Sequence, residues 1–385
     1  MMADDPLSQL RRYQILLLEM PGNIPANDCS KQFHPDLSPL DWHLGHCVFT
    51  ETFWLREVVM DLEKISDTHK QLYIPELSKK VARSSALPSH AELCEWAAHT
   101  QQTNIDYLGE LIETGGAADL MQDNYLLFFL TQHYAQHIET CNYILAQRNL
   151  QADTDFKVGS PLNAASPGHE YRELERGSYS IGAADRRRHY DNECPGFSVE
   201  LDTFQIATTA VSNAEFLGFM QDGGYQTASY WGDKAWQWRT QNAINCPQHW
   251  RLDEAGNYYG TDANGAYTLL NDAPVSGLSH FEANALASWA KARLPHEYEW
   301  EAAKKKGVLL KCGQVWEWCQ NSLHPYAGFE VFPYAGYSLP WFDQGHFSLR
   351  GHSQYTLPVI QRDTFRNFYE ADKRHFPAGL RLATS

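Results

Sequence analysis

The chain has 385 residues, of which 43% are hydrophobic and 13% are aromatic, and its formal net charge at pH 7 is −16. This length exceeds that of a usual single domain, so we expect two domains with hydrophobic cores of their own. The acidic charge argues against a nucleic-acid-binding protein, which normally presents a basic face. No run of 18 apolar residues is present to span a membrane.

The first part of the chain, residues 7–150, has the periodicity of helices. Apolar residues recur every three to four positions. The segments are 7–20, 40–62, 90–113 and 124–150. We predict a four-helix bundle with a long loop between the second and third helices. Ser38 and Ser89 are the predicted N-caps, with Pro39 as the first residue of the second helix.

The composition and the hydrophobic pattern of the sequence change after residue 150. Residues 151–172 are polar and rich in Gly, Pro and Ser, and we interpret them as a linker. Residues 173–385 combine short strand-like pieces with many aromatic residues, which indicates a loop-rich α+β domain. Its clearest predicted helices follow Ser212, ending at the Gly223–Gly224 pair, and Ser279.

The cellular location is predicted from the cysteines and the N-terminal region. Eight cysteines occur without CxxC pairs, which is typical of reduced thiols. The apolar cluster 15–18 is followed by Glu19 and lacks the cleavage site of a signal peptide. We therefore expect a cytoplasmic protein without a membrane or nucleic-acid partner; the sequence does not indicate an oligomeric state.

Two histidines four residues apart mark a candidate metal site. His133 and His137 lie in the predicted helix 124–150, so their imidazoles share one face. The second helix adds His43 and His46. Two histidines from one helix and one from another can hold an ion with open positions, but imidazole suits iron, zinc, copper or nickel alike. With 17 histidines in the chain, ordinary structural histidines remain the alternative.

The second half contains ordered motifs: "VSGLSHFEANALASWAKARLPHEYEWEAA", "GQVWEWCQ" and "TFRNFYEADKRHFPAGLRL". These segments resemble the formylglycine-generating-enzyme/sulfatase-modifying-factor domain, which has a C-type-lectin-like fold. They resemble in particular the form fused to an N-terminal DinB-like bundle, as in ergothioneine sulfoxide synthases and the related ovothiol and selenoneine synthases. The resemblance covers nearly the whole chain. It implies a non-heme oxidoreductase that uses Fe(II) and O2 to form a C–S bond between a thiol donor and a histidine derivative, giving a sulfoxide.

The resemblance also implies roles for individual residues of the bundle. The family's first iron ligand ends a W-x-x-x-H pattern, which here places it at His46. The other two iron ligands correspond to His133 and His137. Gln136 resembles the residue that hydrogen-bonds the histidine-derived substrate, and a neutral amide can orient an imidazole without competing for the metal. His43 is then expected to have a structural role or to support a ligand such as His46, one turn later, in preference to binding the metal itself.

The second domain supplies the remaining expected site residues. The Y-x-x-Y-S pattern begins at Tyr334, which resembles the family's catalytic phenol, with Tyr337 as its competitor. Asn367 and Phe368 resemble the pair that holds the amino-acid end of the substrate. An aromatic face beside a quaternary ammonium gains about 1–2 kcal/mol when desolvated. Related proteins often carry Trp at the position of Phe368, so this contact is expected to be weaker here.

Several positions depart from the family pattern. Users of γ-glutamylcysteine carry two arginines in the interhelical loop and an aspartate two residues after the asparagine; here Arg83 is the only arginine and Tyr369 takes the second position. We therefore expect free cysteine, or an uncharged sulfur or selenium compound, as donor. The usual "RGGSW" is "RGHSQ" at 350–354, and the loop at 301–315 is short. No cysteine follows Cys319, which disfavours the copper chemistry of formylglycine-generating enzymes.

Three alternatives to this function remain open from the sequence. One is a selenoneine-type synthase that joins a selenosugar to trimethylhistidine. Another is a non-catalytic metal-binding module. The third is a DinB-type thiol transferase that uses zinc.

Overall fold

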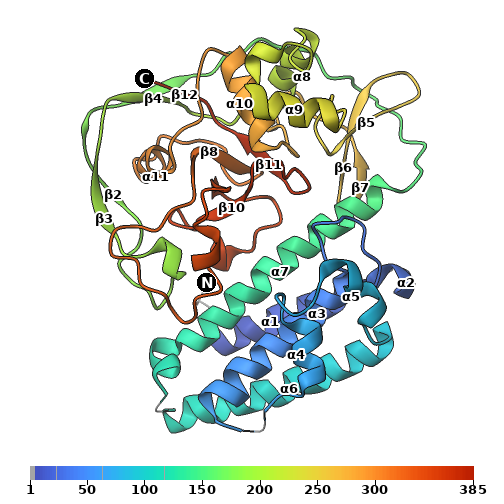
Figure 1. Ribbon diagram of the computed structural model, residues 1–385, viewed down its shortest axis with the longest axis vertical. Helices are drawn as coiled ribbons and strands as arrows, with labels where there is room; N and C mark the ends of the chain where they lie inside the picture. Colours follow the sequence, from blue (N-terminus) through green and yellow to red (C-terminus); the bar gives the residue numbers. More distant parts are fainter. Residues whose placement is uncertain (1–4, 23, 63, 117) are drawn as a thin grey trace. The chain divides into compact units, whose positions relative to one another are not determined.

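The computed structural model describes residues 5–22, 24–62, 64–116 and 118–385. It divides them into two compact units (Figure 1). The first contains the described residues up to Arg148 together with 356–360, and the second contains 149–355 and 361–385. The predicted fold class, an all-α bundle joined to an α+β domain, is confirmed.

The first unit is built from helices, and four long ones, α1, α3, α6 and α7, form its body (Figure 1). α3 continues into π-helical turns at Phe53–Val59, and the expected long loop contains the short helices α4 and α5. The bounds are α1 Pro6–Glu19, α2 Ala26–Cys29, α3 Leu40–Thr52, α4 Asp67–Tyr73, α5 Lys80–Ala86, α6 His90–Thr114 and α7 Tyr125–Leu150.

The helix ends show which local predictions hold. The hydroxyl of Ser89 accepts the Glu92 N–H while the Glu92 carboxylate accepts the Ser89 N–H, a complete capping box at the start of α6. The prediction for α3 is wrong by one residue. Pro39 is its N-cap, Leu40 is its first residue, and no side chain caps it. The Ser38 hydroxyl instead accepts a hydrogen bond from the Arg83 guanidinium.

One buried carboxylate joins the four long helices. Glu51 of α3 accepts hydrogen bonds from Gln14 of α1 (2.8 Å), Asn104 of α6 (2.7 Å) and Tyr134 of α7 (2.7 Å). All four side chains are buried. Burial raises the pKa of Glu51, and the three hydrogen bonds oppose that rise. Because each donor would be unsatisfied without this acceptor, the network fixes how the helices pack.

The second unit combines small sheets with short helices. One four-stranded sheet has the order β10-β9-β8-β11, and three-stranded sheets have the orders β1-β4-β12 and β5-β6-β7. β2 pairs with β3. The strands are β1 Tyr171–Leu174, β2 Gly177–Ile181, β3 Phe197–Leu201, β4 Phe204–Ala207, β5 Trp250–Leu252, β6 Tyr258–Asp262, β7 Gly265–Tyr267, β8 Trp316–Ser322, β9 His346–Gly351, β10 Asn367–Glu370, β11 Ala378–Leu380 and β12 Ala383–Thr384; the helices are α8 Asn213–Gln221, α9 Asp233–Gln241, α10 His280–Trp289 and α11 Glu297–Lys305.

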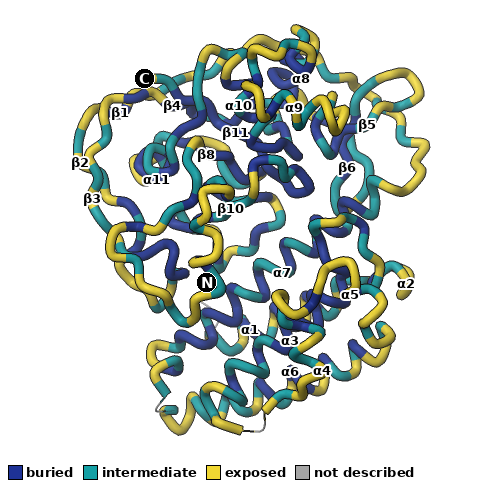
Figure 2. Tube along the Cα trace, in the orientation of Figure 1, coloured by how far each residue is buried: buried dark blue, intermediate teal, exposed yellow. Residues whose placement is uncertain are grey.

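The strands of the second unit differ in how far they are buried (Figure 2). β11 and the first half of β8 are buried, whereas β2 and β3 alternate between exposed and less exposed positions. β1 begins at Tyr171, so the predicted linker extends two residues too far. Among the described residues, no helix is both long and apolar enough to cross a bilayer.

Buried ion pairs connect distant segments within the loop-rich second unit. Arg366 binds both carboxylate oxygens of Glu297, at 2.8 and 2.7 Å, and Arg381 binds both oxygens of Glu317 at 2.8 Å. The Trp300 indole N–H also donates to Glu317. Burial alone would raise the pKa of Glu297, but the neighbouring guanidinium charges outweigh it and lower the pKa to about 2. Such bidentate pairs fix geometry where little regular structure is available.

Candidate metal centre and substrate groups

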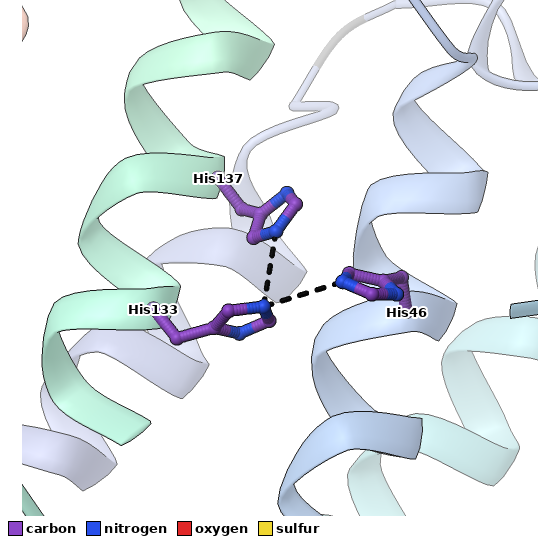
Figure 3. A group of neighbouring side chains, drawn as sticks. All are labelled: His46, His133 and His137. Atoms are coloured by element: carbon purple, nitrogen blue, oxygen red, sulfur yellow. Dashed lines mark hydrogen bonds between the residues drawn. The ribbon is translucent and has the colours of Figure 1, made fainter. Parts of the chain in front are cut away.

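Three imidazoles from two helices meet inside the bundle. His46 lies on α3, and His133 and His137 lie one turn apart on α7 (Figure 3). His133 Nε2 is 3.2 Å from His46 Nε2 and 3.1 Å from His137 Nε2. One ligand atom of each ring lies within 4.8 Å of the other two. The structure therefore brings together the three residues that the sequence predicts as a metal site.

The spacing of these nitrogens suits a metal ion. Two donors about 2.1 Å from one ion and at right angles to each other are separated by about 3 Å. His46 is buried, while His133 and His137 are partly exposed. Three nitrogen donors do not fill the coordination sphere of a metal ion, which leaves positions for further ligands.

The chain itself sets the orientation of the His46 ring. Its Nδ1 lies 2.7 Å from the backbone oxygen of Tyr73, the last residue of α4, which leaves Nε2 to face the other rings. Trp42 stacks on the face of the His46 ring, with ring centroids 4.7 Å apart and planes 10° apart. The Trp42 indole N–H is held by the Leu72 carbonyl at 2.8 Å. The end of α4 thus fixes both rings.

His43 contacts a different candidate ligand from the expected one. Its Nδ1 lies 2.7 Å from Nδ1 of His137, so it pairs with His137 and not with His46. A metal on His137 Nε2 would require a proton on His137 Nδ1, which then donates to His43. The expected support of His46 is therefore corrected: the Tyr73 carbonyl contacts His46, and His43 contacts His137.

Burial keeps these imidazoles neutral. It lowers the pKa of His46 to about 4 against the opposing hydrogen bond to Tyr73, and it lowers the pKa values of His43, His133 and His137 well below the usual 6.5. Neutral imidazole is the form that binds metals. The group therefore offers free nitrogen lone pairs at neutral pH.

Gly45 and Tyr73 are site residues that the sequence interpretation missed. A Cβ at Gly45 would lie 2.3 Å from atoms of the Tyr73 ring, so only glycine permits this contact. Tyr73 is buried and its ring lies parallel to that of Trp96. A glycine inside a helix next to a candidate ligand was the available signal.

Gln136 lies on α7 between the two histidines. In a helix it shares a face with His133, three residues earlier, and adjoins His137. Its side chain is partly exposed, and its backbone oxygen accepts a hydrogen bond from Thr140. Its position in the sequence therefore puts an amide-bearing residue on the same helix, beside the two candidate ligands.

The two candidate phenols of the second unit differ in their surroundings. Tyr337 stacks on Tyr190, with ring centroids 4.0 Å apart and planes 16° apart. Tyr334 is 38% exposed and its ring packs over Gly336. The Tyr337 ring thus has a packing role in the turn, while that of Tyr334 is accessible.

Asn367 and Phe368 are the first two residues of β10. Successive strand side chains leave opposite faces, so the two do not present a common surface. Asn367 Oδ1 accepts the Phe368 N–H at 2.9 Å. Trp341, which the sequence interpretation missed, lies 6.1 Å from the Phe368 ring and is 38% exposed. An indole is therefore present beside Phe368 although position 368 itself lacks one.

The residues at the departures from the family pattern have packing roles. Arg83 is buried, donates to the backbone oxygens of Ser78 and Pro75, and lies 3.7 Å above the Trp42 ring. Tyr369 stacks on Phe376 at 4.0 Å.

His352 of the changed "RGHSQ" motif packs against the stretch 301–315. Gly313, in this stretch, has a φ of +102°, and a Cβ there would lie 2.1 Å from the His352 ring. The ring of His352 therefore occupies the space directly over Gly313.

Comparisons with known proteins agree with this layout. Residues 9–141 match the DinB superfamily, and residues 163–312 match the sulfatase-modifying factor enzyme 1-like domain. The hercynine oxygenase of Mycobacterium tuberculosis is 29% identical, covering 91% of this chain and 92% of that protein. Ergothioneine biosynthesis protein 1 of Schizosaccharomyces pombe is 23% identical over 86% of this chain and 47% of its own length.

The second domain has relatives of its own. The formylglycine-generating enzyme of Bos taurus is 30% identical, but it covers only 43% of this chain and 46% of that enzyme. The hercynine oxygenase match extends over both domains. The chain is therefore an ergothioneine sulfoxide synthase-like enzyme that joins a DinB superfamily domain to a sulfatase-modifying factor domain.

Proposed function

We propose that this enzyme uses iron(II) and O2 to join the sulfur of cysteine to the imidazole ring of a histidine derivative, giving a sulfoxide. One S–H and one ring C–H bond are lost, and one C–S and one S=O bond form. The four electrons released reduce O2, of which one oxygen atom enters the sulfoxide and the other leaves as water. The reaction is thus balanced without a further reductant.

The convergence of His46, His133 and His137 carries this proposal, in a chain whose relatives over both domains include hercynine oxygenases. Three neutral imidazoles suit iron(II) and leave coordination positions for further ligands. Bound iron would supply the one-electron chemistry that allows O2 to react with a thiol and an aromatic ring.

The protein's own groups bind and orient the substrates in this proposal. The Gln136 amide hydrogen-bonds the imidazole of the substrate. Phe368 with Trp341 offers an aromatic surface to the trimethylammonium group at the amino-acid end of the substrate. Asn367, whose side chain leaves the opposite face of β10, holds the backbone of this segment through the Phe368 N–H. Tyr334, whose ring is accessible, donates a proton to the reacting oxygen through its phenol.

Free cysteine is the thiol donor that best fits the surroundings of Arg83. The Arg83 guanidinium donates hydrogen bonds to Ser38, Ser78 and Pro75. It could bind an additional carboxylate of a larger thiol donor only by breaking these buried hydrogen bonds. None of the relatives named above points to a selenium donor. The match of the hercynine oxygenase over both domains also argues against a non-catalytic module.

The proposal is tested by anaerobic reconstitution with iron(II), followed by O2 and product mass analysis. The panel combines histidine and trimethylhistidine with cysteine and γ-glutamylcysteine. We expect O2 uptake only with a histidine derivative and cysteine together, and a product heavier by the sulfoxide-linked cysteine. His133→Ala should abolish both signals. Equal activity of zinc-loaded protein without O2 uptake would support the thiol-transferase alternative instead.

A further inference from the structure

A second group of metal-binding side chains lies in the first unit, apart from the three histidines. Ligand atoms of Cys29, Asp41 and His90 lie within 4.8 Å of one another. Cys94 adjoins them, with its Sγ 3.6 Å from His90 Nε2. Two thiols, an imidazole and a carboxylate are the donors of tetrahedral zinc sites.

The carboxylate in this group lacks a full set of partners. Asp41 Oδ1 lies 2.7 Å from His90 Nδ1, but within the described part of the chain Oδ2 has no hydrogen-bond partner. The Asp41 side chain is only 1% exposed. A buried carboxylate oxygen without a donor is costly, and a cation beside it would remove that cost.

The imidazole lies between the carboxylate and one of the thiols. His90 Nδ1 is 2.7 Å from Asp41 Oδ1, and Cys94 Sγ is 3.9 Å from Nδ1 and 3.6 Å from Nε2.

An ion could reach this group from solvent. A pocket of about 360 Å³ opens beside it and includes His90, together with Ala26, Asn27, Ser30, Ser84 and Leu87. Cys94 and His90 are partly exposed, whereas Cys29 and Asp41 are buried. The group therefore has a buried side that can hold an ion and an open side that can admit one.

We propose that Cys29, Asp41, His90 and Cys94 bind a zinc-type divalent ion, separate from the three-histidine site. The ligands come from α2, from the first turn of α3 and from the first two turns of α6. An ion here would pin the start of α3, the helix that carries His46. Its role is structural, since the four ligands fill a tetrahedral coordination sphere.

The test uses cobalt(II) as a spectroscopic probe, added anaerobically to reduced, metal-free, full-length protein. Only the proposed site contains cysteine, so a near-ultraviolet thiolate-to-cobalt charge-transfer band reports it alone. We expect two equivalents of cobalt to bind, one of them with this band. The His133→Ala/His137→Ala variant should lose one equivalent and keep the band. Cys29→Ser/Cys94→Ser should lose the band and keep the other equivalent.

A second measurement on the unmodified chain does not depend on the folding of variants. Zinc should slow the alkylation of Cys94 by iodoacetamide at least tenfold, read by peptide mass analysis. Cys246, which is also partly exposed but lies in the second unit, should react at an unchanged rate.

Two results would overturn the proposal: wild-type protein that binds cobalt without a thiolate band, and Cys94 that reacts equally fast with and without zinc. Asp41 would then serve only to orient His90. Neither result depends on iron activity, so loss of oxygenase function leaves this test intact.

Discussion

The packing of Tyr73 against Gly45 can be tested by Gly45→Ala. The added Cβ would lie 2.3 Å from the Tyr73 ring, so the ring must withdraw by about 1 Å to reach ordinary contact distance. Tyr73 is buried, with Phe49 and Trp96 beside its ring, so its backbone must move with it. The Tyr73 carbonyl that holds His46 Nδ1 therefore shifts.

The expected effect on stability is a partial cancellation. Overpacking costs about 1–3 kcal/mol, whereas replacing glycine by alanine inside a helix gains about 1 kcal/mol. The expected effect on metal binding is larger, because loss of a partner of a metal-bound histidine lowers affinity about 10–100-fold. Metal affinity should therefore fall more clearly than the melting temperature.

The assay is an anaerobic titration of metal-free protein with cobalt(II) or iron(II), alongside a thermal melt. Gly109→Ala is the matched control. Gly109 also lies inside a helix, α6, and a Cβ there would meet only a methyl group of Leu7, at 4.0 Å. The control should bind metal normally and melt at the same temperature or slightly higher. If Gly45→Ala binds metal as tightly as the wild type, the Tyr73 carbonyl does not position His46.

Further predictions concern other contacts. His43→Phe removes the partner of His137 and should weaken metal binding about tenfold in the same titration; unchanged affinity would assign His43 to packing alone. Glu51→Ala removes the acceptor shared by three buried hydrogen-bond donors. It should lower the free energy of unfolding, measured by urea denaturation, by at least about 3 kcal/mol. The lowered pKa of Glu297 contributes about 3 kcal/mol to the free energy of unfolding above pH 4.5, and this contribution is lost as the pH falls toward 2. The difference in unfolding free energy between the wild type and Glu297→Gln, followed by tryptophan fluorescence, should therefore become smaller over that range. A difference that stays constant with pH would contradict this prediction. Tyr334→Phe should slow product formation 100-fold or more while substrate binding, measured by calorimetry, persists.

Local signals in the sequence were reliable where neighbours within four residues decide the structure. The capping box at Ser89 and the shared face of His133 and His137 both depend on helix geometry alone. The division into a bundle and an α+β domain follows from hydrophobic periodicity in the same way. The family motifs, read from the same sequence, named the histidines that converge.

Contacts between distant residues could not be obtained in this way. Ser38 loses its predicted capping role because the Arg83 guanidinium, 45 residues later, takes its hydroxyl. The partner of His43 is His137, and the acceptor for His46 is the carbonyl of Tyr73. Local hydrogen bonding sets where helices form, but long-range packing sets which side chains meet. The sequence by itself thus determined the elements and candidate ligands, and only the tertiary structure decided how the ligands are held.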